Sequence, residues 1–255
     1  MKFLNYLLPV IIIFLSAIIL YSSDKTGIYQ IPVFDYVTGR FDPSAHNAFV
    51  NLSNTAIPAA RKNIYLRKEA VEAFEIMLAD FNKDHPGIKI WIQSGARNFS
   101  AQKSIWDRKW TGQLRTTGTS DITKIKDPVK RAKLILRYSS MPGTSRHHWG
   151  TDFDINHLNN RYYSKGEGAI IYNWFVLNAY KYGFGNPYAA GRESGYEEEK
   201  WHWSYLPLAK IFLNDWNTLY RNSPEAFNTK NLFQGSQESI HLAPVYVNSI
   251  NGECK

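Results

Sequence analysis

Residues Pro142 to Asp154 read PGTSRHHWGTDFD and combine two adjacent histidines, a glycine and two aspartates at alternate positions. Neutral imidazole and carboxylate are ligands that suit zinc in a catalytic site. His147 and Asp154 are seven positions apart, which is roughly 23 Å along one strand or about 10 Å along one helix. Neither element alone brings both groups to one ion. The chain must therefore turn back between them, and Gly150 is the residue that permits such a turn.

The expected returning strand carries both carboxylates on one face. Asp152 and Asp154 are two positions apart, so they point the same way, and Phe153 points to the opposite face. Asp152 either orients a ligand imidazole from behind or binds the metal in place of Asp154. His148 is expected to point away from the ion.

A third ligand and a base are needed for a catalytic zinc site, and the sequence EKWHWSY at 199–205 offers both. From Trp201 onward, aromatic and polar residues alternate, which predicts a strand. His202 then faces away from Trp201 and Trp203. Glu199 precedes the strand and is expected in the turn that leads into it.

These motifs resemble a known family. Ser-x-His-x-x-Gly-x-x-x-Asp at 145–154, Glu-x-x-His at 199–202 and Ser-Gly-x-Arg at 94–97 with a following Gln are similar to zinc D-alanyl-D-alanine carboxypeptidases of the vancomycin-resistance type. That group shares a fold with lysostaphin-type endopeptidases and the hedgehog signalling domain. The resemblance implies one Zn²⁺ per chain, and it implies these site residues: metal ligands His147, Asp154 and His202; catalytic residues Glu199 (the base) and Arg97; substrate-binding residues Arg97, Gln102 and Ser145; and Asp152 behind a ligand.

The resemblance also implies a reaction. The expected function is hydrolysis of the D-alanyl-D-alanine end of peptidoglycan stem peptides in the bacterial cell envelope. Two alternatives stay open: an L,D-carboxypeptidase or cross-link endopeptidase with the same zinc chemistry, and a zinc-bearing binding module without turnover. Arg97 also has a plainer interpretation as one half of a structural ion pair.

The remaining sequence predicts an α+β fold in which helices flank a small, mainly antiparallel sheet that carries the zinc site. Strands are expected at 88–93, 150–156 and 201–205; their antiparallel arrangement is implied by the resemblance. Residues 67–84 form an amphipathic pattern typical of a helix. Further helices are expected at 100–110, 128–138, 166–182 and 206–220. The helix at 206–220 is expected to be the last one. Residues 184–196 are expected to form a loop, and residues 223–255 are polar with one alternating patch at 245–247.

Composition limits the possible partners. The 255 residues carry a net charge of +8 but no run of five Lys or Arg and no nucleic-acid-binding motif, so no nucleic-acid partner is expected. Cys254 is the only cysteine, which excludes a zinc site of the Cys-x-x-Cys kind and an intramolecular disulfide.

The N-terminus predicts export. Residues 3–21 are mostly apolar and span about 28 Å as a helix, close to the thickness of a bilayer core. The absence of a small-x-small cleavage site favours an uncleaved membrane anchor over a cleaved signal peptide. The expected division is an anchor or signal at 1–22, a lead-in segment at 23–60, a catalytic domain at 61–222 on the outer side of the cytoplasmic membrane, and an extension at 223–255.

Overall fold

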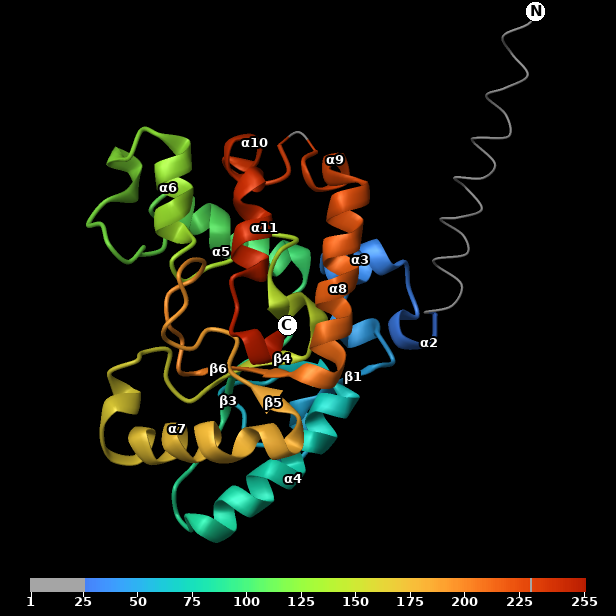
Figure 1. Cartoon of the computed structure of the whole chain (residues 1–255), viewed down its shortest axis with the longest axis vertical. Coiled ribbons are helices and arrows are strands. Elements are labelled where there is room, and N and C mark those ends of the chain that lie inside the picture. Colours follow the sequence, from blue (N-terminus) through green and yellow to red (C-terminus); the bar gives the residue numbers. More distant parts are fainter. Residues whose placement is uncertain (1–25, 230) are drawn as a thin grey trace, which may run out of the picture.

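A four-stranded antiparallel sheet lies inside an envelope of helices (Figure 1). The computed structural model describes residues 26–229 and 231–255. The apolar segment 3–21, predicted to anchor or export the chain, lies outside these residues. Within the described ranges no helix is both long and apolar enough to cross a membrane.

The sheet has the order β3-β4-β6-β5, with β3 at Ile92–Ser94, β4 at Asp152–Ile155, β6 at His202–Tyr205 and β5 at Phe184–Gly185. All three pairings are antiparallel, and Asp154 lies directly opposite His202. A separate two-stranded sheet pairs β1 (Phe49–Asn51) with β2 (Tyr65–Arg67). The predicted α+β class and the antiparallel arrangement are confirmed.

Two details of the sheet differ from the prediction. The strand expected at 88–93 is regular only from Ile92, because the side chain of Asn156, whose φ is +46°, donates to the carbonyl of Lys89 and so replaces the ladder there. The expected loop at 184–196 begins with strand β5. Its two residues pair with the end of β6, and so short a strand leaves no periodic pattern in the sequence.

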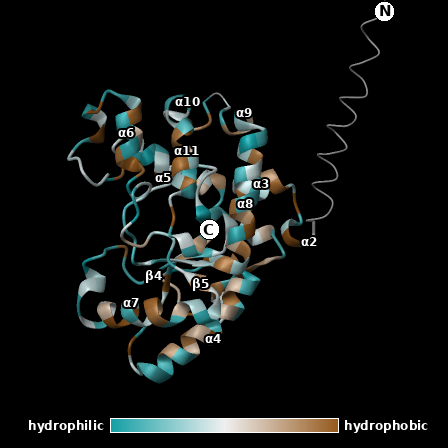
Figure 2. Ribbon diagram, in the orientation of Figure 1, coloured by the Kyte–Doolittle hydropathy of each residue, from teal (hydrophilic) through white to brown (hydrophobic). Residues whose placement is uncertain are grey.

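Helices α4 (Lys68–Asp84) and α7 (Gly166–Asn178) cover one face of the sheet, where Phe74, Phe153 and Phe175 share a core. Figure 1 shows α8 (Leu206–Asn222), α5 (Phe99–Trp110) and α6 (Pro128–Ile135) on the other side. Both hydrophilic and hydrophobic residues occur along α4 and α8 in Figure 2, as expected of helices with one buried face. The site lies between the sheet and this second group of helices.

Both ends of the described chain are more ordered than predicted. Helix α8 is not the last helix, because α9 (Pro224–Phe227), α10 (Ser236–Ser239) and α11 (Ala243–Asn248) follow it. Phe227, Phe233 and Ile240 anchor this segment in the second core. At the other end, α2 (Thr26–Tyr29) buries Tyr29 in that same core and α3 (Val33–Val37) packs on α8. Single apolar anchors between polar residues give no helical period, so the sequence pattern could not reveal these contacts.

Candidate metal centre and active site

The turn predicted at Gly150 is present. Arg146–Trp149 form one turn of 3-10 helix, Gly150 follows with φ at +71°, and β4 begins two residues later. A side chain at Gly150 would place its Cβ about 2.2 Å from the ring of Phe49. Glycine is therefore required both by the backbone conformation and by the close approach of this ring. The reversal brings His147 back over the strand that carries Asp154.

Three potential ligands converge at this point. Nε2 of His147 lies 3.4 Å from Oδ2 of Asp154, and Nδ1 of His202 lies 3.1 Å from Oδ1 of the same carboxylate. The three ligand atoms all lie within 4.8 Å of one another. All three side chains are buried. Two imidazoles and one carboxylate in this arrangement fit a tetrahedral metal ion that keeps one position for water or substrate.

The outer ring nitrogens of both histidines are already engaged. Nδ1 of His147 lies 2.9 Å from the carbonyl oxygen of Gly95, which fixes the proton on Nδ1 and leaves Nε2 as the free donor atom. Nε2 of His202 lies 3.0 Å from Oδ1 of Asp152, which leaves Nδ1 of that ring toward Asp154. Burial would lower the pKa of His202, but the carboxylates of Asp152 and Asp154 raise it to about 9. A bound metal ion would displace the proton from Nδ1, so that each histidine turns an unprotonated nitrogen to the shared centre.

Asp152 lies behind His202 rather than beside Asp154. Its carboxylate accepts hydrogen bonds from Nε of Arg146 at 2.7 Å, from Thr151 and from Ser204. Burial alone would raise the pKa of Asp152, but the Arg146 guanidinium and His202 hold it below its usual range. This geometry fits a carboxylate that orients a ligand imidazole, and it does not favour Asp152 as a replacement for Asp154.

His148 points away from the centre, as predicted. The backbone N–H of Gly143 donates to its Nε2 at 3.0 Å, and its Nδ1 donates to the carbonyl of Arg97 at 2.7 Å. Burial lowers the pKa of His148 to about 3. The ring is therefore a neutral structural group that joins two loops of the site.

Glu199 lies in the turn before β6. Its backbone N–H donates to the carbonyl of Tyr188 at 3.0 Å, and its Oε2 lies 3.8 Å from Nδ1 of His202. Burial raises the pKa of Glu199 to about 8, an effect that His202 opposes and Asp154 reinforces. A carboxylate of raised proton affinity beside three potential metal ligands is suited to accept a proton from water.

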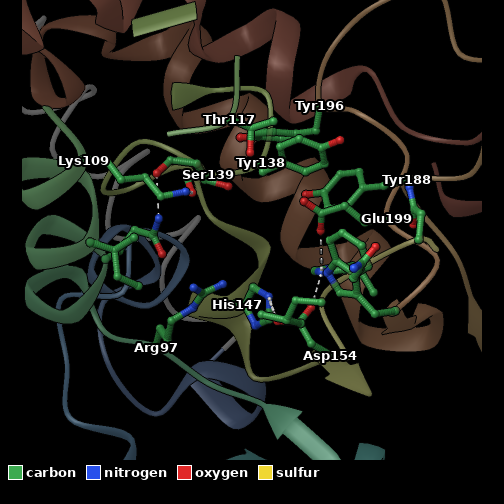
Figure 3. A pocket seen from close by; sticks show the side chains of 18 residues that line it. Arg97, Lys109, Thr117, Tyr138, Ser139, His147, Asp154, Tyr188, Tyr196 and Glu199 are labelled. Atoms are coloured by element: carbon green, nitrogen blue, oxygen red, sulfur yellow. Dashed lines mark hydrogen bonds and ion pairs between the residues drawn. The ribbon is translucent and has the colours of Figure 1, made fainter. Parts of the chain in front are cut away.

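A cavity of about 560 Å³ opens onto these groups. Figure 3 shows Arg97 and Lys109 on one side of it and Asp154 and Glu199 on the other, with His147 between them. The Arg97 guanidinium makes no ion pair within the described residues, and its buried Nε has no hydrogen-bond partner there. The described residues thus offer Arg97 no structural ion pair.

Of the two other predicted substrate-binding residues, Gln102 lines the cavity and Ser145 does not. Gln102 lines the cavity; its amide nitrogen donates to the carbonyl of Ser140 at 2.7 Å, and its buried Oε1 has no partner among the described residues. Ser145 does not line the cavity, and its buried Oγ likewise lacks a partner in the described parts of the chain.

Lys109, Ser139 and Tyr188 line the cavity but are not among the site residues predicted from the sequence. Nζ of Lys109 donates to Oγ of Ser139 at 2.6 Å, and the ring of Tyr188 lies 4.6 Å from that of His202. Lys109 follows Gln102 by seven residues, two helical turns, so both are on one face of α5. That spacing was a usable signal for Lys109. Tyr188 lies in an irregular loop, and nothing in its neighbourhood in the sequence marks it.

Comparisons with known proteins agree with this geometry. The family model of VanY, D-alanyl-D-alanine carboxypeptidase, matches residues 63–208. Putative carboxypeptidase YodJ of Bacillus subtilis (strain 168) is 31% identical over 150 residues, which cover 56% of this chain and 46% of that protein. The chain thus spans about half of the length of this curated relative.

Solved structures are also similar. The LdcB LD-carboxypeptidase is 26% identical with a TM-score of 0.50, over 69% of this chain and 76% of that one. A vancomycin-resistance D,D-pentapeptidase VanY in complex with Zn(II) is 21% identical with a TM-score of 0.45, over 62% of this chain and 84% of that one. The family model covers more than half of the chain and includes every residue of the converging site, so the chain belongs to the VanY family of D-alanyl-D-alanine carboxypeptidases.

Proposed function

We propose that this protein is a zinc-dependent carboxypeptidase that removes the terminal D-alanine from peptidoglycan stem peptides ending in D-alanyl-D-alanine. The observation that carries the proposal is the polarity of the cavity: the carboxylates of Asp154 and Glu199 lie on one side, and Arg97, which has no ion pair among the described residues, lies across from them. A peptide with a free carboxylate at its end matches this separation of charges.

Zinc would be held by Nε2 of His147, the carboxylate of Asp154 and Nδ1 of His202. A bound zinc ion supplies a water molecule of lowered pKa and polarises the scissile carbonyl. Glu199 accepts the proton of that water at its carboxylate and transfers it to the leaving amine. Asp152 and the carbonyl of Gly95 keep the two imidazoles in the required orientation.

Arg97 binds the carboxylate of the terminal residue. A guanidinium holds a carboxylate through two parallel hydrogen bonds, and the buried Nε of Arg97 has no hydrogen-bond partner among the described residues. Gln102 also lines the cavity. A terminal carboxylate held this way supports an exopeptidase over a cross-link endopeptidase, and a base beside the metal donors disfavours a binding module without turnover.

The location is part of the proposal. Residues 3–21 would hold the chain in the cytoplasmic membrane, with the catalytic domain, residues 61–222, on its outer side. The apolar character of residues 3–21 and the extracytoplasmic position of peptidoglycan support this placement.

The proposal is tested with three soluble peptides incubated with the zinc-loaded protein and analysed by mass spectrometry: a pentapeptide stem ending in D-Ala-D-Ala, its C-terminally amidated form, and a tetrapeptide stem ending in one D-Ala. We expect loss of a single D-alanine from the free-acid pentapeptide and at least tenfold slower cleavage of the amide, with Glu199→Gln as the inactive control. Preferred cleavage of the tetrapeptide would replace the D,D by an L,D specificity. Equal cleavage of acid and amide would favour an endopeptidase.

A further inference from the structure

The positive charge of the chain is concentrated in one segment. Residues 103–137, here called the basic lobe, contain ten Lys and Arg against three Asp and no Glu. The whole chain has 30 Lys and Arg against 22 Asp and Glu, so this lobe holds seven of the eight excess charges. The lobe comprises most of α5, a loop and α6, and Figure 1 shows α6 and its loop projecting from the body of the protein.

The three acidic groups of the lobe already have partners. Asp107 pairs with Lys103, and Asp121 and Asp127 accept hydrogen bonds from the backbone N–H groups that begin the next helical turns. Two other cations have partners: Arg137 pairs with Glu197, and Arg131 donates to the carbonyl of Ile125.

Six cations of the lobe are left exposed and without an ion pair among the described residues: Arg108, Arg115, Lys124, Lys126, Lys130 and Lys133. Closely spaced charges of one sign repel one another and raise the local concentration of polyanions at low ionic strength. The repulsion between these cations is relieved when an anionic partner neutralises them.

The side chains on the exposed surface of the lobe indicate which kind of anionic partner it can bind. Its exposed side chains other than the cations are small or polar, and the large hydrophobic residues that the structure exposes all lie outside residues 103–137. A helix that binds in the membrane interface needs an apolar face, and binding of single-stranded nucleic acid relies on exposed aromatic rings. The lobe offers neither, which favours a flexible, solvated polyanion.

The position of the lobe links it to the cavity. Thr117 and Lys109, both within the lobe, line the cavity that contains Arg97 and Glu199 (Figure 3). We propose that the basic lobe is a docking surface for a flexible anionic polymer bearing phosphodiester groups, next to the mouth of the active site. If the proposed peptidase function holds, this polymer is one that surrounds the peptide substrate, but the binding itself does not require catalysis.

The test measures the binding of fluorescently labelled linear polyphosphate to the purified protein by fluorescence anisotropy over a series of salt concentrations. The lobe variant carries Lys124→Gln, Lys126→Gln, Lys130→Gln and Lys133→Gln. The matched control removes the same charge from exposed lysines outside the lobe: Lys62→Gln, Lys68→Gln, Lys83→Gln and Lys89→Gln. Circular dichroism and thermal unfolding verify that both variants fold.

We expect the lobe variant to bind at least tenfold more weakly at low salt and the control to stay within about threefold. Each neutralised contact contributes roughly 0.7 to the slope of log K against log salt, so four lost lysines lower that slope by up to about 3. Equal losses in both variants, or no binding by the unchanged protein, would overturn the proposal. Tighter, lobe-dependent binding to vesicles with 30% anionic lipid would also overturn it and identify a membrane surface instead. Cleavage of the short soluble pentapeptide, measured in parallel, reports on the peptidase proposal separately.

Discussion

Substitutions in the buried pair Arg146–Asp152 are expected to change the free energy of unfolding and the affinity for zinc by different amounts. Arg146 and Asp152 are 1% and 0% exposed, and their Nε–Oδ1 distance is 2.7 Å. Substitution Asp152→Asn removes the charge but keeps the shape, and it leaves a buried guanidinium uncompensated. We expect the free energy of unfolding of the metal-free protein to fall by about 3–5 kcal/mol. The same change weakens the acceptor behind His202, so zinc affinity should drop by about 10–100-fold.

A double variant distinguishes the two effects. Arg146→Met with Asp152→Asn removes both charges, so we expect much of the lost stability to return while zinc affinity stays low. Urea unfolding of the metal-free proteins gives the stability, and competition with a fluorescent zinc chelator gives the affinity. The exposed pair Lys68–Glu72 provides the control, since Glu72→Gln should cost no more than about 1 kcal/mol. The reasoning fails if the double variant recovers zinc affinity together with stability. Complete loss of zinc in Asp152→Asn, with zinc retained in Asp154→Ala, would instead make Asp152 the ligand.

Four further outcomes are expected. Glu199→Gln should keep zinc, by elemental analysis, and lose hydrolysis by about 10²–10⁴-fold or more; near-normal turnover would identify another base. Lys109→Gln should raise KM for the free-acid pentapeptide more than it lowers kcat, whereas Arg108→Gln on the exposed side of α5 should change neither. Because His148 stays neutral in the folded state down to about pH 3, its contribution to stability is complete above pH 6.5 and decreases by about 1.4 kcal/mol per pH unit below it; unfolding curves of His148→Gln should lack this component. A fusion of residues 1–30 to an export-dependent reporter should be active and remain in the membrane fraction, whereas a soluble exported reporter would indicate a cleaved signal.

The sequence was most informative where the chain's own geometry is tightly constrained. If His147 and Asp154 bind one ion, their spacing requires a reversal at Gly150, and the alternation around His202 predicts the face on which that ring lies. The choice of His147, Asp154 and His202 as the ligands came from the family resemblance. Their meeting in space depends on the β4–β6 pairing, which the family resemblance implied and local patterns did not. Short-range information therefore defined each half of the centre.

Other parts of the molecule depend on contacts between distant residues. The indole of Trp106 donates to the carbonyl of Gln234, and Phe233 packs on the same ring, which orders a segment whose own sequence shows no periodicity. The loop that carries Tyr188 is held by Arg192, which donates to the carbonyls of Ser249 and Tyr196. The Trp106–Gln234 and Arg192–Ser249 hydrogen bonds join residues more than fifty positions apart, and local sequence patterns cannot reveal such contacts.

The connection between Gly95, Arg97 and His147 has a consequence for how such enzymes diverge. The carbonyl of Gly95 holds the ring of His147, and the backbone N–H of Arg97 donates to the carbonyl of His147 at 3.0 Å. The segment that presents the proposed carboxylate-binding group is therefore the same one that positions a proposed metal ligand, and neither can be remodelled without disturbing the other. New substrate preferences are open chiefly to the opposite walls of the cavity, where α5 and the loop around Tyr188 can accept new side chains while the hydrolytic chemistry is inherited unchanged.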